Sequence, residues 1–520
     1  MRWLQAKLVA TAAVLALQFA VATPVPQSET DSLEDVADTA RLPGCNLAEI
    51  LKLASYLSKQ AEVFFPGSVD FVKYSTRWSN LETPIVNITV LPATENDVVT
   101  IVRAANKCNI PFLAYNGVHG SITTLGRMDW GIAINLAKLS GVTIAANGQT
   151  ATIAGGTNSK VVIDTLWEAG KQTVTGTCEC VSYMGPALGG GHGWLQGHYG
   201  LIADQFVSMK VVLADGSLKT ISASSNSDLF WAMKGAGHNF GIVTSVTVKI
   251  YPRTHVNWAI ETLMFTGDKV KALYQAANDH LLRARNGSQP VDIINWSYWF
   301  NLPQVDPTGP VIEFYIIQEG VPVVDPVYTQ PFRALGPISA TPANGTYRDM
   351  ARWVNIALDS PPCQNAGMAN PRFPIYLPEY NATAQEEVYA LFKAATNASS
   401  PFANSLFMFE GYSMQGVDAV DENSAAYAFR EDRLLTAPLV QYAPAGPVRD
   451  QQARQLGNQL REVLRRGSGR SQMHTYVNYA YGDESTKEWY GFEQWRQDRL
   501  RALKKKYDPR GRFSFYAPAA

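Results

Sequence analysis

The stretch from Gly176 to Gly200, GTCECVSYMGPALGGGHGWLQGHYG, gathers two of the five cysteines and two of the seven histidines of the chain. Cysteine and histidine serve as metal ligands or nucleophiles, and glycine lets backbone N–H groups approach an anion. A zinc site, a phosphate cradle and a flexible surface segment are therefore the alternatives. A tetrahedral zinc site would use Cys178, Cys180, His192 and His198, but the C-x-C spacing and the surrounding glycines argue against metal.

Two further glycine clusters, Asn116–Gly120 and Gly235–Gly241, flank predicted strands in the same part of the chain. The sequence contains neither a P-loop nor a G-x-G-x-x-G dinucleotide fingerprint between a strand and a helix. Ordinary nucleotide-binding folds are therefore not supported. Three glycine clusters in one region favour a large cofactor wrapped by backbone.

The elements that must position these clusters alternate between short strands and helices. Thr94 and Asp97 predict a helix start, with apolar residues following at helical spacing. Asp215-Gly216 joins two β-rich runs and predicts a hairpin. Strands are predicted at 85–91, 110–115, 131–139, 150–156 and 206–222, a helix at 159–170, and a helix, turn and strand at 229–250. This pattern predicts one α+β domain with its core at residues 79–253.

Beyond Tyr251 the pattern changes. Alternating strands are predicted at 258–265, 311–319 and 405–413, with amphipathic helices between them that include 268–284. Such a pattern predicts an antiparallel sheet covered by helices on one side. We therefore divide the chain into domains at 43–253 and 254–475 and a C-terminal segment, 476–520, that returns to the first domain and includes a basic helix ending at Tyr507.

The N-terminus predicts export from the cell. Residues 1–22 have a positive start, an apolar run and a small-x-small cleavage signal, as in a signal peptide. Residues 23–42 are polar and acidic and predict a mobile leader. The formal charge of −1 and pI of about 6.7 argue against a nucleic-acid partner, and no apolar run predicts a membrane span. Six glycosylation sequons agree with a secreted glycoprotein: Asn87, Asn286, Asn295, Asn344, Asn381 and Asn397.

Five cysteines are too few for a disulfide scaffold. Cys178 and Cys180 are separated by one residue, which makes a bond between them difficult. By elimination, we predict one bridge, Cys45–Cys108, and leave Cys363 without a role.

The glycine segments PFLAYNGVHGS, GTCECVSYMGPALGGGHGWLQGHYGLIADQ and GAGHNFGIVTSVTVKIYP resemble the flavin-binding segments of the berberine bridge enzyme-like flavoproteins. These belong to the vanillyl-alcohol oxidase superfamily. YVNY (476–479) and YDPRGRF (507–513) resemble that family's C-terminal signature, and the whole chain from about residue 40 is similar to secreted fungal FAD-linked oxidoreductases. The resemblance implies an α+β fold, with a PCMH-type FAD-binding domain beside a substrate domain of antiparallel sheet and flanking helices.

The resemblance also implies how FAD is held. His119 matches the histidine joined to the flavin 8α carbon, and Cys178 matches the cysteine joined to C6. The usual C-x-x-V-G pattern is replaced by Cys178-Glu179-Cys180-Val181-Ser182, so attachment through Cys178, through Cys180 or through His119 alone stays open. The other implied cofactor-binding residues are Asn116, Gly117, Gly120, Ser121, Gly185, Gly189, Gly190, Gly191, His192, Gly193, Gly241, Ile242, Val243 and Asn478.

For catalysis, Gln441 aligns with the catalytic glutamate of plant alkaloid-cyclising members and cannot replace it as a base. We therefore predict Tyr476 and Tyr479 as the catalytic residues, on opposite faces if YVNY is extended, with Gln441 orienting them. Glu410 is the alternative carboxylate. Aromatic residues that could line the pocket or fill the core are Trp296, Tyr298, Trp299 and Phe300.

These features together predict a secreted FAD-dependent oxidase. Its partners would be molecular oxygen and a small-molecule substrate, an alcohol, phenol or polyketide intermediate of secondary metabolism. A carbohydrate oxidase is the alternative within the same family. A flavin-bearing cyclase without net redox change is a second alternative, and a secreted binding protein without activity would leave covalent flavin chemistry unexplained.

Overall fold

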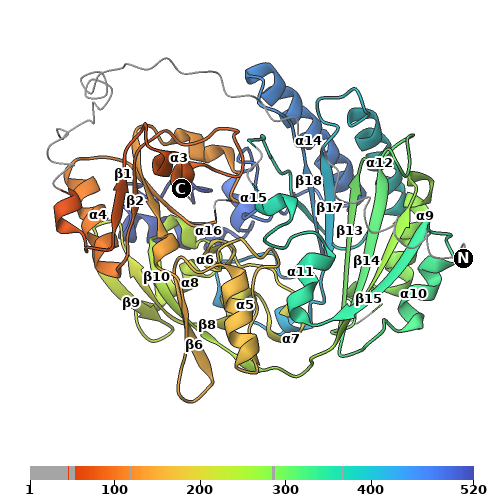
Figure 1. The fold of residues 1–520 in the computed structure, drawn as a ribbon, viewed down its shortest axis with the longest axis horizontal. Coiled ribbons are helices and arrows are strands. Elements are labelled where there is room, and N and C mark those ends of the chain that lie inside the picture. The colour runs from red at the N-terminus through yellow and green to blue at the C-terminus, as the bar shows by residue number, and fades with distance from the viewer. Residues whose placement is uncertain (1–44, 46–52, 118, 284–286, 365–366, 520) are drawn as a thin grey trace, which may run out of the picture. The chain divides into compact units, whose positions relative to one another are not determined.

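A computed structural model describes residues 45, 53–117, 119–283, 287–364 and 367–519. The predicted signal peptide and leader, and the sequon at Asn286, lie outside the described residues. Two sheets carry the glycine clusters, and a third, larger sheet follows them in the chain (Figure 1).

The first sheet is four-stranded, with β2, β4 and β3 parallel and β1 added antiparallel at the edge. Helix α4, Glu95–Lys107, begins at the predicted capping box of Thr94 and Asp97 and buries Val98, Ile101 and Val102. Its packing on the sheet fixes the end of β3, which leads into the loop at Asn116. The strands in spatial order are β1 Glu62–Phe64, β2 Val86–Leu91, β4 Gly131–Asn135 and β3 Phe112–Tyr115.

The second sheet is five-stranded and antiparallel. The predicted hairpin at Asp215-Gly216 joins β8 to β9, and Gly216 takes the left-handed φ of 78° that such a turn requires. The strands in spatial order are β5 Val142–Ile144, β6 Thr150–Ala154, β10 Ile242–Lys249, β8 Phe206–Val212 and β9 Leu218–Ser222; the helices α5 Ser159–Glu168 and α8 Ser227–Met233 accompany them.

The third sheet has seven strands, and every neighbouring pair is antiparallel, as predicted. Helices cover one face of it (Figure 1) and share one core with it. The strands in spatial order are β15 Ser339–Gly345, β12 Trp258–Phe265, β14 Val311–Glu319, β13 Ile293–Phe300, β17 Leu406–Gly411, β18 Leu434–Leu439 and β16 Ile375–Leu377. The covering helices are α9 Val270–His280, α10 Pro326–Arg333, α12 Ala382–Ala395 and α14 Pro447–Gly467.

Alternation along the strands separates the two faces of this sheet. Trp299 packs with Phe407 and Phe409 in the core under the helices, so of the two roles left open for it, filling the core is the correct one. Trp296 and Tyr298 lie on the other face, in the core shared with the glycine segments. Phe300 packs against that core.

The C-terminal residues return to the first two sheets. Phe513 packs edge-on against Phe112 of β3, with ring centroids 5.5 Å apart. Asn239 donates to the backbone oxygen of Ala517 and accepts from the N–H of Ala519. This segment contains α15 Thr486–Tyr490 and the predicted basic helix α16 Gln494–Tyr507.

Short helices and strands elsewhere in the chain connect the larger elements. They are α3 Val69–Ser75, β7 Lys171–Gln172, α6 Met184–Leu188, α7 Gln196–Tyr199, β11 Tyr251–Pro252, α11 Met350–Trp353 and α13 Gln415–Asp418.

Two disulfides are present where one was predicted. Cys45–Cys108 is confirmed, and Cys180–Cys363 is a second bridge that the sequence analysis missed. Sequence spacing could not find it because its two sulfurs come from loops 183 residues apart.

Burial also limits the predicted glycosylation. Asn87 and Asn295 lie in strands and are 8% and 1% exposed, so they cannot carry a glycan in the folded protein. Asn344, Asn381 and Asn397 are exposed. Among the described helices, none combines the length and apolar character needed to cross a membrane.

Candidate active site

His119 follows β3 in the first glycine cluster and stacks on Trp78, with ring centroids 5.0 Å apart and planes 14° apart. Desolvation, together with the charge of Arg372, lowers the pKa of His119 to about 3. The imidazole is therefore neutral at physiological pH. A neutral ring nitrogen can act as a nucleophile, which the protonated ring cannot.

The glycine loops approach other chain segments so closely that side chains do not fit. A Cβ on Gly117, whose φ is +71°, would lie 2.9 Å from the backbone nitrogen of Ser182. A Cβ on Gly189 would lie 2.3 Å from Oδ1 of Asn478, and one on Gly193 would lie 2.1 Å from the oxygen of Thr175. These loops thus bring three parts of the chain, at residues 117, 175–193 and 478, into close contact with no side chain on the glycines between them. Backbone N–H groups left uncovered in this way can bind an anionic cofactor such as FAD.

Three sulfur atoms gather beside His119. Cys180 is bonded to Cys363, and Cys178 is the free thiol. The sulfur of Cys178 lies 3.7 Å from that of Cys180 and 3.6 Å from that of Cys363. Nε2 of His119 is 3.4 Å from the sulfur of Cys180. Burial raises the pKa of Cys178 to about 11.

The zinc ligands considered from sequence do not come together. His192 is buried, its ring exchanging hydrogen bonds with Gln196 at 2.9 Å and with the Tyr376 hydroxyl at 2.7 Å. His198 instead pairs with Glu319 at 2.6 Å. The histidine that lies close to Cys178 and Cys180 is instead His119. The side chains of these three residues and of Cys363 form one cluster, in which the sulfur and ring nitrogen atoms lie within 4.8 Å of one another.

The other predicted cofactor residues lie around these loops. The backbone oxygen of Gly120 accepts from Arg77, and the N–H of Gly185 donates to Ser182. Asn478 donates to the backbone oxygens of Pro186 and Gly189, which ties the C-terminal segment to the second loop. Ser121 is buried, and Asn116 donates to the backbone oxygen of Gly156. Gly190 and Gly191 have φ of 96° and 83°. Gly241 precedes β10, whose residues Ile242 and Val243 bury their side chains in the cores on either side of the strand.

Tyr476 and Tyr479 form a turn in which the N–H of Tyr479 donates to the oxygen of Tyr476. Their rings contact each other with centroids 5.1 Å apart. The prediction that an extended YVNY would put them on opposite faces is therefore wrong, because the turn brings both rings to the same side. Tyr476 accepts from the backbone N–H of His192 at 3.3 Å.

Glu410 of β17 connects two tyrosines. Its carboxylate accepts from Tyr479 at 2.9 Å and from Tyr412 at 2.7 Å, and the side chain is buried. Desolvation raises the pKa of Glu410, although the two hydrogen bonds oppose that change. Burial, followed by the charge of Glu410, raises the pKa of Tyr479 well above its usual value.

Arg372 places a cation beside the aromatic rings of this site. Its guanidinium carbon lies 4.5 Å from the ring centroid of Trp78 and 4.5 Å from that of Tyr479. Burial raises the pKa of Tyr479 and of Glu410, and the charge of Arg372 opposes that change. Burial lowers the pKa of His119, and the same charge lowers it further. No motif marks this residue, because it comes from a loop that only tertiary packing brings to the site.

Gln441 makes its hydrogen bonds to residues other than the tyrosine pair. Its amide donates to Asn370 at 2.8 Å, and its backbone N–H donates to Ser405. Within the described part of the chain no hydrogen bond joins it to Tyr476 or Tyr479. Its predicted role in orienting them therefore has no contact to support it.

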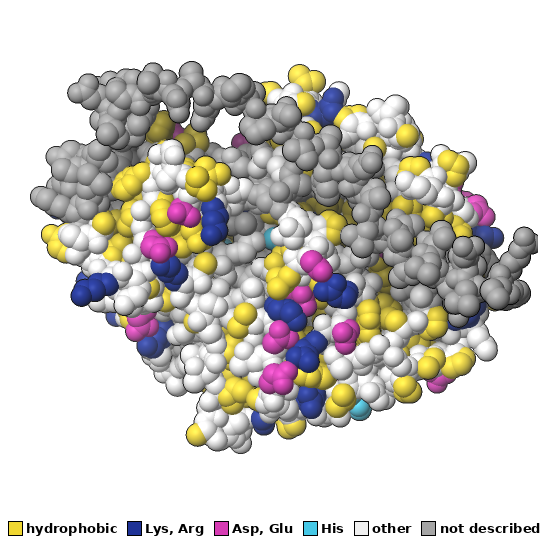
Figure 2. Space-filling view, in the orientation of Figure 1, with side chains coloured by type: hydrophobic (Ala, Val, Ile, Leu, Met, Phe, Trp, Pro, Cys, Tyr) yellow, Lys and Arg dark blue, Asp and Glu magenta, His cyan; other side chains and the backbone are white. Residues whose placement is uncertain are grey.

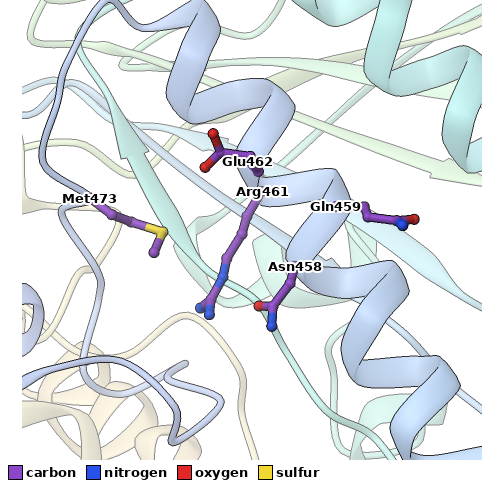
Figure 3. Close-up of a pocket in the computed structure, with 5 residues that line it drawn as sticks. All are labelled: Asn458, Gln459, Arg461, Glu462 and Met473. Atoms are coloured by element: carbon purple, nitrogen blue, oxygen red, sulfur yellow. The ribbon is translucent and has the colours of Figure 1, made fainter.

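An open depression of about 380 Å³ lies elsewhere, beside α14 (Figure 3), lined by Asn458, Gln459, Arg461, Glu462 and Met473. Its arginine is paired with Asp483 and Glu484, so its charge is already compensated. On the face shown in Figure 2, the described basic side chains are interspersed with acidic ones. Such a mixed surface does not attract a polyanion.

Comparisons with known proteins agree with this site. Residues 86–222 match a family model described as an FAD binding domain. The FAD-linked oxidoreductase chyH of Penicillium rubens is 58% identical over 473 residues, which cover 91% of this chain and 94% of that protein. Two solved structures each give a TM-score of 0.75 and cover 91% of this chain: the BBE-like 1 protein of Physcomitrella patens, 20% identical with 99% of its chain covered, and glucooligosaccharide oxidase of Acremonium strictum, 18% identical with 98% covered.

The fold is thus that of the BBE-like, PCMH-type flavoproteins, and the site combines a glycine cradle with a neutral histidine. The chain belongs to the FAD-linked oxidoreductases. FAD is its cofactor, and the cradle of bare backbone fits that group.

Proposed function

We propose that this FAD-linked oxidoreductase is an oxidase that uses molecular oxygen and removes a hydride and a proton from a hydroxyl-bearing small molecule. The observation that carries the proposal is the hydrogen-bonded pair of buried Glu410 and half-buried Tyr479, held beside Arg372 in the same site as His119 and Cys178. FAD supplies the hydride acceptor when bound. The residues described here supply the proton acceptor and the attachment points.

The covalent attachment we propose runs through His119 and Cys178. The neutral ring of His119 supports it, as does the position of the free Cys178 thiol within the same cluster. Glucooligosaccharide oxidase, the structural neighbour reported above, has a 6-S-cysteinyl, 8α-N1-histidyl FAD. The raised pKa of Cys178 opposes thiolate formation, so the attachment at this residue would be slow until the cofactor is in place.

Tyr479 and Glu410 together can accept the substrate proton. Tyr479 alone is a weak base because burial and the adjacent carboxylate raise its pKa. As the substrate hydroxyl gives its proton to the Tyr479 oxygen, the proton of Tyr479 can pass along the 2.9 Å hydrogen bond to Glu410. Arg372 beside the ring of Tyr479 then stabilises negative charge that develops on the tyrosine oxygen.

Aromatic side chains next to this pair are compatible with a flat, conjugated substrate. Trp296 lies 5.6 Å from Tyr412, ring centroid to ring centroid, and packs on Trp194 at 4.3 Å. Tyr298 lies on the same face of the sheet, and burial followed by the charge of Glu410 raises its pKa. We therefore propose an alcohol, phenol or polyketide intermediate of secondary metabolism as substrate.

A carbohydrate oxidase is the second candidate. The observation that favours it is the shared fold with several proteins named as oligosaccharide or carbohydrate oxidases, at TM-scores of 0.73 to 0.75. Aromatic rings also stack on sugar faces, so the same residues suit either class of substrate.

The test is anaerobic mixing of purified holoprotein with aryl alcohols, polyketides and oligosaccharides. A substrate should bleach the flavin, and readmitted oxygen should restore the colour with formation of hydrogen peroxide. Tyr479→Phe should slow the bleaching while flavin content stays unchanged. Tyr427→Phe, which removes another buried hydroxyl near His192, is the matched control. Conversion of a substrate without bleaching would contradict the oxidase and support a cyclase.

We also propose that the protein is secreted. Two disulfides and three exposed sequons support this location. Expression in a fungal host should deliver glycosylated protein to the medium, and a product retained unglycosylated in the cell would contradict it.

A further inference from the structure

The disulfide Cys180–Cys363 ties two loops together at the proposed flavin-attachment site. Cys180 belongs to the second glycine segment, and Cys363 ends a loop of the substrate-domain region, Asn355–Cys363. The two loops are also joined by hydrogen bonds of Glu179, the residue between the two neighbouring cysteines. Its N–H donates to the oxygen of Ile356 at 3.1 Å, and its carboxylate accepts from the N–H of Leu358 at 2.9 Å.

Without this bridge, three thiols would stand next to one histidine. The sulfur of Cys178 is nearly equidistant from the other two, at 3.7 Å and 3.6 Å. Cys180, not Cys178, makes the 3.4 Å contact with the His119 ring. Distance alone therefore does not decide which sulfur reaches a cofactor bonded to His119.

Intrinsic reactivity does not favour Cys178 either. Its surroundings are desolvated, which disfavours the thiolate that must react. A second selecting feature is needed for a single attachment point, and the disulfide is such a feature because it removes two of the three thiols.

We infer that the Cys180–Cys363 disulfide selects Cys178 as the thiol that bonds to the cofactor. Closing the bridge transfers two electrons and two protons from Cys180 and Cys363 to an external disulfide, which becomes a dithiol. Attachment then joins the Cys178 sulfur to a ring carbon, with loss of the thiol proton and the ring hydrogen, and the two electrons reduce oxygen to hydrogen peroxide. This inference rests on the proposed attachment through Cys178. Cys180 and Cys363 act as positioning residues.

The sequence allows the two neighbouring cysteines to be separated, because Glu179 lies between them. Digestion with a glutamate-specific protease and trypsin places Cys178 in a peptide that ends at Glu179 and Cys180 in the next peptide. Holoprotein is alkylated to block free thiols and digested with both proteases without reduction, and mass spectrometry then locates the flavin and the disulfide. Visible absorbance of the acid-precipitated protein gives the total covalent flavin.

In the unaltered holoprotein we expect flavin on the Cys178 peptide and a Cys180–Cys363 bridge. In Cys363→Ser the freed Cys180 competes, so flavin should divide between the Cys178 and Cys180 peptides, with loss of the single attachment. The double variant Cys180→Ser/Cys363→Ser has no competing thiol and should restore flavin to Cys178 alone. Cys45→Ser/Cys108→Ser, which opens the other bridge, should keep the original attachment.

The outcomes distinguish cysteinyl attachment from selection by the disulfide. No flavin on any cysteine of the unaltered holoprotein would refute the proposed cysteinyl attachment, and the selection with it. Flavin on Cys178 alone in Cys363→Ser, with Cys180 found as a free thiol, would overturn the selection and leave the attachment intact. A double variant that folds, as judged by circular dichroism, but lacks cysteinyl flavin would also overturn selection, since the bridge would then act by holding the loops.

Discussion

The hydroxyl of Tyr479 lies 2.9 Å from the carboxylate of Glu410, a residue 69 positions earlier in the chain. Strand β17 supplies the acid and a turn in the C-terminal segment supplies the phenol. Glu410 is buried and Tyr479 is half-buried, so a proton shared between them has little contact with solvent. Their pairing determines how the proposed oxidation should respond to pH.

Flavin reduction should become faster as pH rises through the pKa of Glu410, because the protonated acid cannot accept a proton. Since burial raises that pKa, this acid limb should lie above the usual value for glutamate. Glu410→Gln should remove the limb and slow reduction by roughly 10²–10⁴-fold, the usual contribution of a general base. Stopped-flow reduction at a series of pH values measures both effects. Tyr412→Phe keeps the carboxylate but loses a hydrogen bond that lowers its pKa, so this variant should retain the limb at a higher pH. A Glu410→Gln protein with the native rate would exclude this acid as the base.

Replacing Arg372 with methionine should shift the same limb to higher pH. The cation lowers the pKa of Glu410 and of Tyr479, so its removal leaves burial unopposed by that charge. Arg372→Lys keeps the charge and should retain the position of the limb better than methionine does. Arg372→Met also loses the cation–π contacts with Trp78 and Tyr479, worth about 0.5–2 kcal/mol each. An unchanged limb in Arg372→Met would show that the charge does not act on the proton acceptor.

Gly190→Ala should reduce FAD content and stability more than Gly170→Ala does. Both glycines have a positive φ, 96° and 66°, so both substitutions cost about 1–3 kcal/mol of backbone strain. A Cβ on Gly190 would also lie 2.4 Å from the ring of Tyr427, whereas one on Gly170 meets nothing within 4 Å. Thermal unfolding and the flavin-to-protein absorbance ratio measure the difference. Equal losses in the two variants would contradict a tightly packed cradle.

Opening the Cys45–Cys108 bridge should lower the free energy of unfolding by about 4 kcal/mol on the chain-entropy model, given its sequence separation of 63. The bridge lies at the C-terminal end of α4, away from the proton-transfer pair. Cys45→Ser/Cys108→Ser should therefore unfold at lower guanidinium concentration while its rate of flavin reduction stays native. A slower reduction in the folded variant would show that the bridge reaches the site.

Local sequence signals predicted the elements that form by short-range rules. The capping box of Thr94 and Asp97, the hairpin at Asp215-Gly216 and the alternating strands β12 and β14 lie where their patterns put them. His119 and Cys178 were found by motif and do lie together in the structure.

The parts that sequence reasoning missed depend on contacts between distant residues. Arg372 reaches Tyr479 from another loop, and Cys363 reaches Cys180 across 183 positions, so neither has a local signal. The tyrosines of YVNY were misplaced because a four-residue pattern does not distinguish a strand from a turn. For Trp299 the choice between pocket and core stayed open, because composition alone does not say which face of a sheet a residue occupies.

The docking of the C-terminal segment has a consequence for the order in which the protein can be made. Phe513 packs on Phe112, and Asn239 is bonded to Ala517 and Ala519, although the ribosome delivers these partners hundreds of residues apart. Asn478, which supports the second glycine loop, also emerges late. The cradle for FAD therefore stays incomplete during most of synthesis, and cofactor loading must follow translation of the last turns of the chain. A bulky fusion placed directly after Ala519 would be expected to hinder that final closure, whereas the same fusion on an exposed loop would not.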